Sequence, residues 1–125
     1  MINIAIDGPS GVGKTSIAKK VAKEKGYTYI DTGALYRALV VYFTDRGIDP
    51  EDEAGVAASL ADVEVSVKYI DEVQHVFVND SDVTDRLRTE DISKAASVTS
   101  RYKAVRNKLF DIQRRLASEN DAVMD

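Results

Sequence analysis

Hydrophobic positions in the first third of the chain alternate between short apolar runs and helical spacing. The run Ile2 to Ile6 and the segment Tyr27 to Ile30 predict two strands. Between them, the pattern from Ile17 to Lys25 predicts a helix that Gly26 ends, and a second amphipathic helix follows over Gly33 to Arg46. Strands that alternate with helices form parallel sheets, so this part of the chain predicts an α/β fold.

The pattern changes to a period of two in the middle of the chain. After a helix predicted from Asp49-Pro50 to about Leu60, apolar and polar residues alternate from Val63 to Tyr69. The run Val73 to Val78 predicts a second strand, paired with the first through a turn at Asp71-Glu72. We therefore expect a small antiparallel unit within an α/β chain.

The last part of the chain returns to helical spacing. Helices are predicted from about Glu90 to Ser100 and from about Lys103 to Ser118, and Ala122 to Met124 predicts a buried strand. We divide the chain into three segments: the first part of the α/β core (1–60), the antiparallel insert (61–100) and the return to the core (101–125).

Composition limits the classes of function. The 125 residues carry 17 basic and 21 acidic side chains, a net charge of −4, which argues against a general binder of nucleic acid polymers. Cysteine is absent, so thiolate chemistry is excluded. The chain opens on a strand rather than a charged leader, and no apolar run approaches the roughly 20 residues that span a bilayer. We expect a cytoplasmic protein without a membrane partner.

A nucleotide-binding motif lies between the first strand and the first helix. Gly-x-x-x-x-Gly-Lys-Thr is the Walker A pattern, whose backbone amides surround phosphate oxygens. Lys14 is expected to reach the β and γ phosphates of ATP, and the Thr15 hydroxyl to bind Mg²⁺. The alternative is a glycine-rich turn without a ligand. The predicted phosphate site comprises Gly8, Pro9, Ser10, Gly11, Val12, Gly13, Lys14, Thr15 and Ser16.

A second group of polar residues follows the second predicted strand. Ligands of open parallel sheets collect outside the carboxyl ends of the strands, so Asp31, Thr32 and Gly33 are expected to face the same crevice as the phosphate loop. Arg37, one turn into the next helix, could reach a substrate phosphate. The alternatives are that Asp31 caps the strand end and that Arg37 is a solvated helix residue.

Together these segments resemble the N-terminal part of a bacterial cytidylate kinase. The resemblance implies a P-loop nucleoside monophosphate kinase core with a parallel sheet and a small antiparallel insert. It implies phosphoryl transfer from ATP to CMP or dCMP, with Mg²⁺, by an enzyme of pyrimidine metabolism that is expected to be a monomer at full length. The segments that carry the resemblance are Ile6 to Thr15, Asp31 to Arg37, Leu87 to Glu90, and Ala95-Ala96-Ser97 followed by Val105-Arg106.

The resemblance also assigns the acceptor site. By similarity, Ser97 and Arg106 contact the cytosine edge, whose carbonyl and ring nitrogen accept hydrogen bonds and whose amine donates one. Without the family, both would be ordinary residues of polar helix faces, and Tyr36 is at least as easily a packing residue. The implied CMP-binding residues are Asp31, Thr32, Gly33, Arg37, Ser97 and Arg106.

Two further expectations concern mechanism and length. A nucleoside monophosphate is largely ionised at neutral pH, so transfer needs positioning and charge neutralisation rather than a general base, and Lys14 and Arg37 are the predicted catalytic residues. His75, the single histidine, is expected to be structural or exposed.

Family members continue with Gly-Arg-Asp and a lid, so we expect a chain truncated at its C-terminus. The alternatives are a non-catalytic nucleotide-binding fragment and a kinase for another small acceptor.

Overall fold

The computed structural model of the chain describes residues 3–5, 14–119 and 121–124. It contains two compact units. The first comprises Met1–Gly33 and Gln113–Asp125, and the second comprises Ala34–Ile112. The predicted phosphate-loop residues 8–13 lie outside the described residues. The two units have other bounds than the three predicted segments (1–60, 61–100 and 101–125). The division into three segments stays a prediction.

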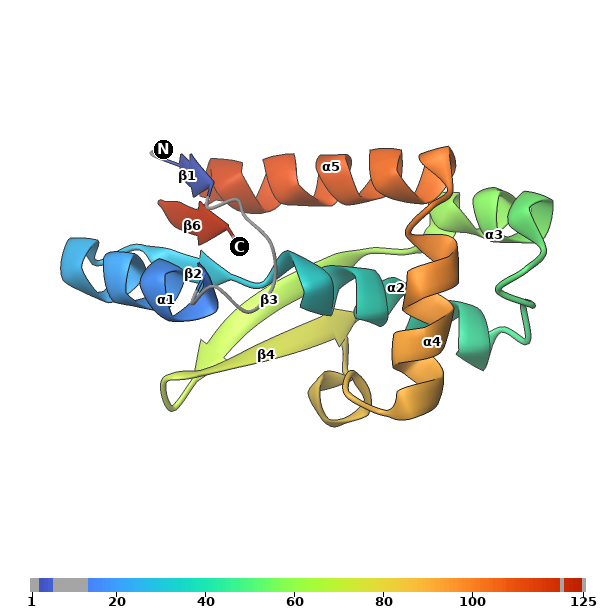
Figure 1. Cartoon of the computed structure of the whole chain (residues 1–125), viewed down its shortest axis with the longest axis horizontal. Helices are drawn as coiled ribbons and strands as arrows, with labels where there is room; N and C mark the ends of the chain where they lie inside the picture. Colours follow the sequence, from blue (N-terminus) through green and yellow to red (C-terminus); the bar gives the residue numbers. More distant parts are fainter. Residues whose placement is uncertain (1–2, 6–13, 120, 125) are drawn as a thin grey trace. The chain divides into compact units, whose positions relative to one another are not determined.

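The first unit is built around a parallel three-stranded sheet (Figure 1). Its strands are β1 (Asn3–Ala5), β2 (Thr28–Ile30) and β6 (Ala122–Met124), in the order β1-β6-β2. The predicted parallel sheet is therefore confirmed. Strand β6 pairs on both sides, so the strand that is last in sequence is central among the described strands.

Helix α1 (Lys14–Lys25) packs on this sheet through a narrow apolar stripe. Ala18 and Ala22 lie one turn apart and are buried against Val123 of β6. Small side chains at these positions allow close approach of helix and sheet. The helix ends at Gly26, whose φ of 70° is the left-handed conformation that glycine adopts at low cost.

The second unit is built around helix α2 (Thr32–Asp45), which begins in the first unit and carries eight buried side chains. The fully buried Leu35, Leu39 and Phe43 recur at a spacing of four residues, as the pattern predicted. Gly47 ends the helix region with a φ of 68°. The next helix, α3 (Glu53–Ser59), begins later than predicted because Asp52 is its N-cap, and it continues into the 3₁₀ turn η1 (Leu60–Asp62).

The antiparallel insert of the second unit is a three-stranded sheet in the order β3-β4-β5. Strands β3 (Val65–Ile70) and β4 (Val73–Val78) form the predicted hairpin, and β5 (Ser81–Asp82) adds a short edge. Both two-residue turns have positive φ at their two central residues, the geometry that matches strand twist. The φ angles are 51° and 65° at Asp71 and Glu72, and 46° and 73° at Asn79 and Asp80.

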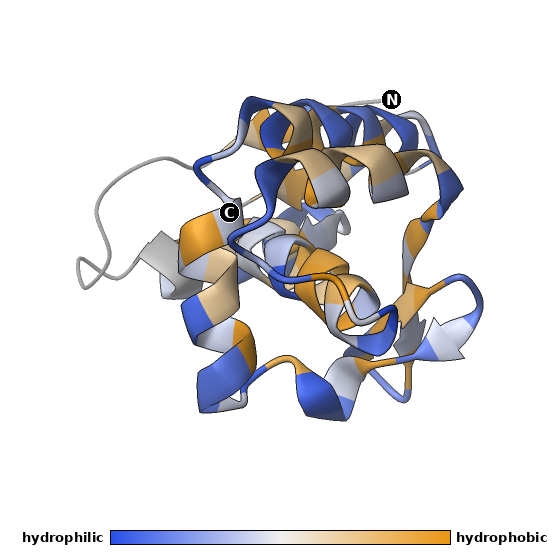
Figure 2. Cartoon of the chain, turned by 90° about the vertical axis from the view of Figure 1, so that its right-hand side faces the viewer, coloured by the Kyte–Doolittle hydropathy of each residue, from blue (hydrophilic) through white to orange (hydrophobic). Residues whose placement is uncertain are grey.

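After the insert, the 3₁₀ turn η2 (Thr84–Arg86) leads to two helices, α4 (Glu90–Thr99) and α5 (Lys103–Glu119). The Thr89 hydroxyl caps α4 by accepting a hydrogen bond from the amide of Ile92. The helices carry both hydrophilic and hydrophobic residues (Figure 2). The predicted apolar face of α5 is confirmed, because these four residues are at most 4% exposed: Val105, Leu109, Ile112 and Leu116.

Candidate functional site

The carboxyl edge of the parallel sheet gathers the first group of predicted site residues. Ala5 of β1 and Ile30 of β2 both pair with Met124 of β6, so all three strands end at the same level. Asp31 leaves β2 at this edge and Thr32 is the first residue of α2. Ligands of parallel sheets bind at such an edge. Gly33, Asp31 and Thr32 are half-buried there.

The described part of the predicted phosphate site is the start of α1. The helix begins at Lys14, so Lys14, Thr15 and Ser16 form its first turn. That turn carries no acidic residue, whereas the last turn carries Lys23 and Lys25. A helix N-terminus carries a partial positive charge, which no acidic side chain of this turn neutralises. The phosphate-binding roles of residues 8–16 stay predictions.

A second group of site residues lies within the second unit, on α2, α4 and α5. Burial raises the pKa of the Tyr36 hydroxyl, and the nearby Arg106 guanidinium lowers it by a smaller amount. The charge of this α5 arginine therefore acts on an aromatic residue of α2. The sequence left both a packing role and a site role open for Tyr36. Its half-buried hydroxyl, on which the Arg106 charge acts, keeps it a candidate site residue.

Ser97 and Arg106 are both exposed and both use a backbone acceptor. The Ser97 hydroxyl donates to the carbonyl oxygen of Ser93, at 3.3 Å, and the Arg106 guanidinium donates to the carbonyl oxygen of Arg101, at 2.6 Å. Within the described part of the chain, no hydrogen bond joins their side chains. A guanidinium has five N–H donors, so Arg106 keeps donors for a ligand, and the Ser97 hydroxyl keeps acceptor capacity.

Arg37 is half-buried on α2, one position after Tyr36. Its guanidinium makes no hydrogen bond or ion pair with any residue that the structure describes. A half-buried cation without an internal partner is available to an anionic ligand. The prediction that Arg37 contacts a substrate phosphate is compatible with this environment and stays a prediction.

His75 has a partner that the sequence did not reveal. Its Nδ1 lies 2.7 Å from Oδ2 of Asp82, which is on the neighbouring strand. The hydroxyl and amide of Thr84 both donate to the other Asp82 oxygen, at 2.5 Å and 3.0 Å. These hydrogen bonds from Thr84 and His75 lower the pKa of Asp82 to about 2. The histidine is thus part of a hydrogen-bond network at the edge of the insert, in agreement with the expected structural role.

The described residues offer no protein-only metal site. They contain no group of three or more histidine, cysteine, aspartate or glutamate side chains placed to hold an ion. Along the same residues, no helix is both long and apolar enough to cross a membrane.

A parallel sheet with a helix after its first strand, together with a small antiparallel sheet, is the arrangement expected of a P-loop nucleoside monophosphate kinase core. Residues 4–125 match the model of the cytidylate kinase family, and the chain belongs to this family. It is 43% identical to the cytidylate kinase of Halalkalibacterium halodurans, over 99% of this chain and 56% of that protein.

Other curated relatives give the same result. The cytidylate kinase of Caldicellulosiruptor bescii is 40% identical, and that of Bacillus subtilis is 39% identical. In both comparisons the match covers 99% of this chain and 55% of the relative. The chain therefore spans about half the length of the curated relatives it matches, and it corresponds to their N-terminal part.

Proposed function

We propose that the full-length protein transfers a phosphoryl group from ATP to CMP or dCMP, which gives ADP and CDP or dCDP. The observation that carries the proposal is the family match over residues 4–125. In this proposal, residues 1–60 and 101–125 belong to the kinase core and residues 61–100 form the insert that serves the monophosphate site. We place the reaction in the cytoplasm, in a protein that is a monomer at full length.

ATP is assigned to the start of α1. Lys14 in the first turn neutralises charge that develops on the transferred phosphoryl group, and the helix N-terminus adds its partial positive charge. The Thr15 hydroxyl, with phosphate oxygens of the nucleotide, would hold Mg²⁺. When bound, the ion supplies further positive charge to the phosphates.

The acceptor site is assigned from the family match, residue by residue. Arg37 contacts the monophosphate, Asp31, Thr32 and Gly33 line the acceptor side, and Ser97 and Arg106 contact the cytosine edge. The absence of a carboxylate or base partner on Arg37, among the described residues, supports this role. Because the attacking phosphate oxygen is already largely ionised, these residues position and neutralise it, and no side chain has to accept a proton.

A second candidate function is binding of nucleotide without transfer. It is favoured by the match to little more than half of each relative, because residues beyond that part can be required to close an active site over its substrates. A kinase for another small acceptor is a third candidate. The family match disfavours it.

One assay separates these candidates. The chain is incubated with Mg-ATP and each of CMP, dCMP, UMP and AMP, and nucleoside diphosphate formation is measured. Lys14→Ala is the test variant, and Lys20→Ala is its matched control, since Lys20 is an exposed lysine on the same helix. Turnover selective for CMP and dCMP that Lys14→Ala alone abolishes supports the proposal.

The same samples distinguish the alternatives by equilibrium binding. ATP binding without turnover in the 125-residue chain favours the fragment, provided that the full-length protein is active. Turnover with another acceptor, or equal activity of Lys14→Ala and Lys20→Ala, contradicts the proposed function.

A further inference from the structure

The turn between α4 and α5 carries an aromatic residue that the proposed function does not use. Tyr102 lies in this turn (100–102), which joins the helix that carries Ser97 to the helix that carries Arg106 (Figure 1). Its side chain is half-buried, and its hydroxyl donates to the carbonyl oxygen of Pro50, at 2.8 Å. Pro50 precedes Tyr102 by 52 residues, so this hydrogen bond anchors the turn to a distant part of the same unit.

The hydroxyl of Tyr102 remains a hydrogen-bond donor at neutral pH. Burial raises its pKa above the ordinary value of about 10, and the carboxylates of segment 49–53, of which Glu53 has the largest effect, raise it further. Both effects disfavour the phenolate. Pro50, which supplies the acceptor, lies in a turn that is closed at the carbonyl oxygen of Asp49 by an amide three residues later, at 2.9 Å. A protonated donor thus meets an acceptor in an ordered turn.

Arg106 is bonded to the backbone of the α4–α5 turn at two points. Its guanidinium donates to the carbonyl oxygen of Arg101, at 2.6 Å, and its amide donates to the carbonyl oxygen of Tyr102, at 3.0 Å. The carbonyl of Arg101 and the amide of Tyr102 belong to one peptide group, and that amide donates to the carbonyl oxygen of Thr99, at 3.0 Å. Because a peptide group is planar, this hydrogen bond also sets the direction of the carbonyl that holds the guanidinium.

The same turn relates Arg106 to Ser97. The amides of residues 100–102 all donate to carbonyl oxygens of α4, at 2.9–3.3 Å. Thr99, two residues after Ser97, is fully buried, and its hydroxyl donates to a carbonyl oxygen within the helix, at 3.0 Å. The two side chains assigned to the base are therefore joined through one ordered turn. The hydrogen bond from Tyr102 ties that turn to the connection between α2 and α3, where Pro50 lies.

We propose that Tyr102 is a positioning residue for base recognition. Its hydroxyl, bound to Pro50, holds the turn in the conformation in which the carbonyl of Arg101 orders the Arg106 guanidinium before the base binds. The proposal rests on the proposed function, which assigns Arg106 to the cytosine edge. A guanidinium that is held by one donor keeps its other donors for a ligand, and it loses less side-chain freedom on binding.

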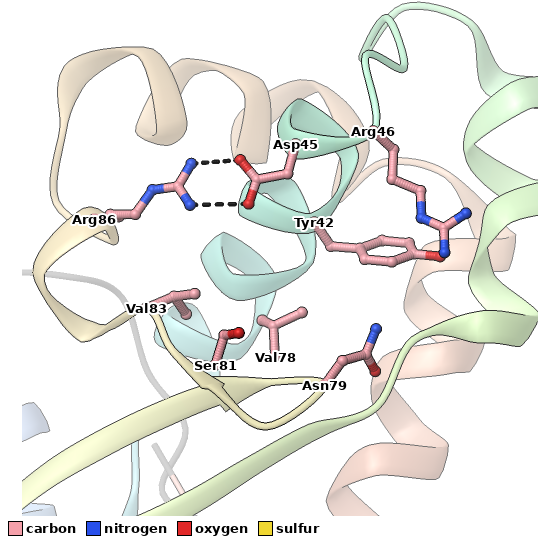
Figure 3. A pocket seen from close by; sticks show the side chains of 8 residues that line it. All are labelled: Tyr42, Asp45, Arg46, Val78, Asn79, Ser81, Val83 and Arg86. Carbon is pink, nitrogen blue, oxygen red and sulfur yellow. Dashed lines mark hydrogen bonds and ion pairs between the residues drawn. The ribbon is translucent and has the colours of Figure 1, made fainter.

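The test compares two variants that each remove one tyrosine hydroxyl and keep the ring. Tyr102→Phe removes the proposed anchor. Tyr42→Phe is the matched control, because the Tyr42 hydroxyl also donates to a backbone carbonyl oxygen, that of Ser59 at 2.9 Å. The Tyr42 ring lines a pocket at the end of α2 that contains no residue of the α4–α5 turn (Figure 3). Urea denaturation verifies that both variants are folded and measures the stability that each hydrogen bond contributes.

Two measurements on the chain separate positioning from stability. Without ligand, the heteronuclear NOE of the Arg106 Nε–H group reports the order of the guanidinium. We expect it to fall in Tyr102→Phe toward the value of the exposed Arg101, and to stay unchanged in Tyr42→Phe. With ligand, competition binding gives the preference for CMP over UMP, which should fall about threefold in Tyr102→Phe alone.

An unchanged NOE of Arg106 in Tyr102→Phe overturns the proposal, because the hydroxyl then does not order the guanidinium. Equal changes in both variants, or a lower NOE with an unchanged CMP to UMP ratio, also overturn it, since the hydrogen bond then has no specific effect on base recognition. Equal or undetectable binding of CMP and UMP by the unchanged chain contradicts the base assignment of the proposed function, and the proposal falls with it. The NOE, measured without ligand, shows which of the two failed.

Discussion

The carboxylate of Asp45 and the guanidinium of Arg86 meet through two parallel hydrogen bonds, although 41 residues separate them. The contact joins the end of α2 to the 3₁₀ turn η2 that follows the insert. The hydrogen bonds from Arg86 lower the pKa of Asp45, which stays ionised at neutral pH. Both side chains remain about half exposed, so water and salt reduce the strength of the pair.

We predict that Asp45→Asn lowers the free energy of unfolding by about 0.5–1 kcal/mol, the upper range for an exposed ion pair, because the bond is two-pointed. Urea denaturation at low and high salt measures the effect, which should shrink as salt is added. Glu24→Gln is the control, since Glu24 lies at 4.0 Å from Lys20 in an exposed pair. A double-mutant cycle with Arg86→Gln that shows no coupling would contradict the prediction.

The lowered pKa of Asp82 predicts that the stability of the fold depends on pH. Its pKa of about 2 lies below the ordinary value near 3.9, so the folded state favours the carboxylate, and this stabilisation is present above the ordinary value. It is lost as pH falls toward about 2. Asp82→Asn should therefore be less stable than the unchanged chain at about pH 7, with the difference shrinking below about pH 4.

Urea denaturation across this pH range measures the difference for Asp82→Asn. Asp80→Asn, at an exposed position of the preceding turn, is the matched control and should show no such convergence at low pH. If both variants lose the same stability at every pH, the hydrogen bonds from Thr84 and His75 do not stabilise the fold.

Neighbouring residues of α5 test the assignment of its buried face. Leu109 is 3% exposed and Phe110 is 56% exposed. We predict that Leu109→Ala lowers the free energy of unfolding by about 2–5 kcal/mol, because it leaves a cavity in the core. Phe110→Ala should change the free energy of unfolding by less than about 0.5 kcal/mol. Thermal unfolding followed by circular dichroism compares the two variants. A larger loss for Phe110→Ala would mean that α5 buries a different face.

Base recognition is tested at Ser97. If its hydroxyl contacts the cytosine edge, Ser97→Ala should reduce the preference for CMP over UMP about fivefold, the effect of one neutral hydrogen bond. Ser118→Ala is the matched control, since its hydroxyl also donates to a carbonyl oxygen within a helix, that of Arg115 at 2.7 Å. Competition binding of CMP and UMP gives the ratio. An unchanged ratio in Ser97→Ala would remove this serine from the base site.

Sequence periodicity predicted the local elements well, because each depends on neighbouring residues. The apolar face of α5, the hairpin around Asp71 and the glycine stops of two helices are all confirmed. The start of α3 was placed too early, because Asp52 serves as its cap rather than as a residue of its first turn. Sequence alone does not decide which of several acidic residues caps a helix.

Contacts between distant segments were not predictable in this way. The pair His75 and Asp82 depends on how β5 returns beside β4, and the electrostatic effect of Arg106 on Tyr36 links residues of two separate helices. No spacing rule links such residues. The predicted site residues were identified by motif and family resemblance, and the structure adds their burial and neighbours for those that it describes.

The central place of β6 has a consequence for the order of folding during synthesis. Strands β1 and β2 are made early, yet the strand that pairs with both comprises residues 122–124. Until the ribosome has released this segment, the two early strands lack the backbone partner that joins them. The second unit is continuous in sequence over residues 34–112. It can therefore begin to fold first, while the parallel sheet waits for β6 to emerge.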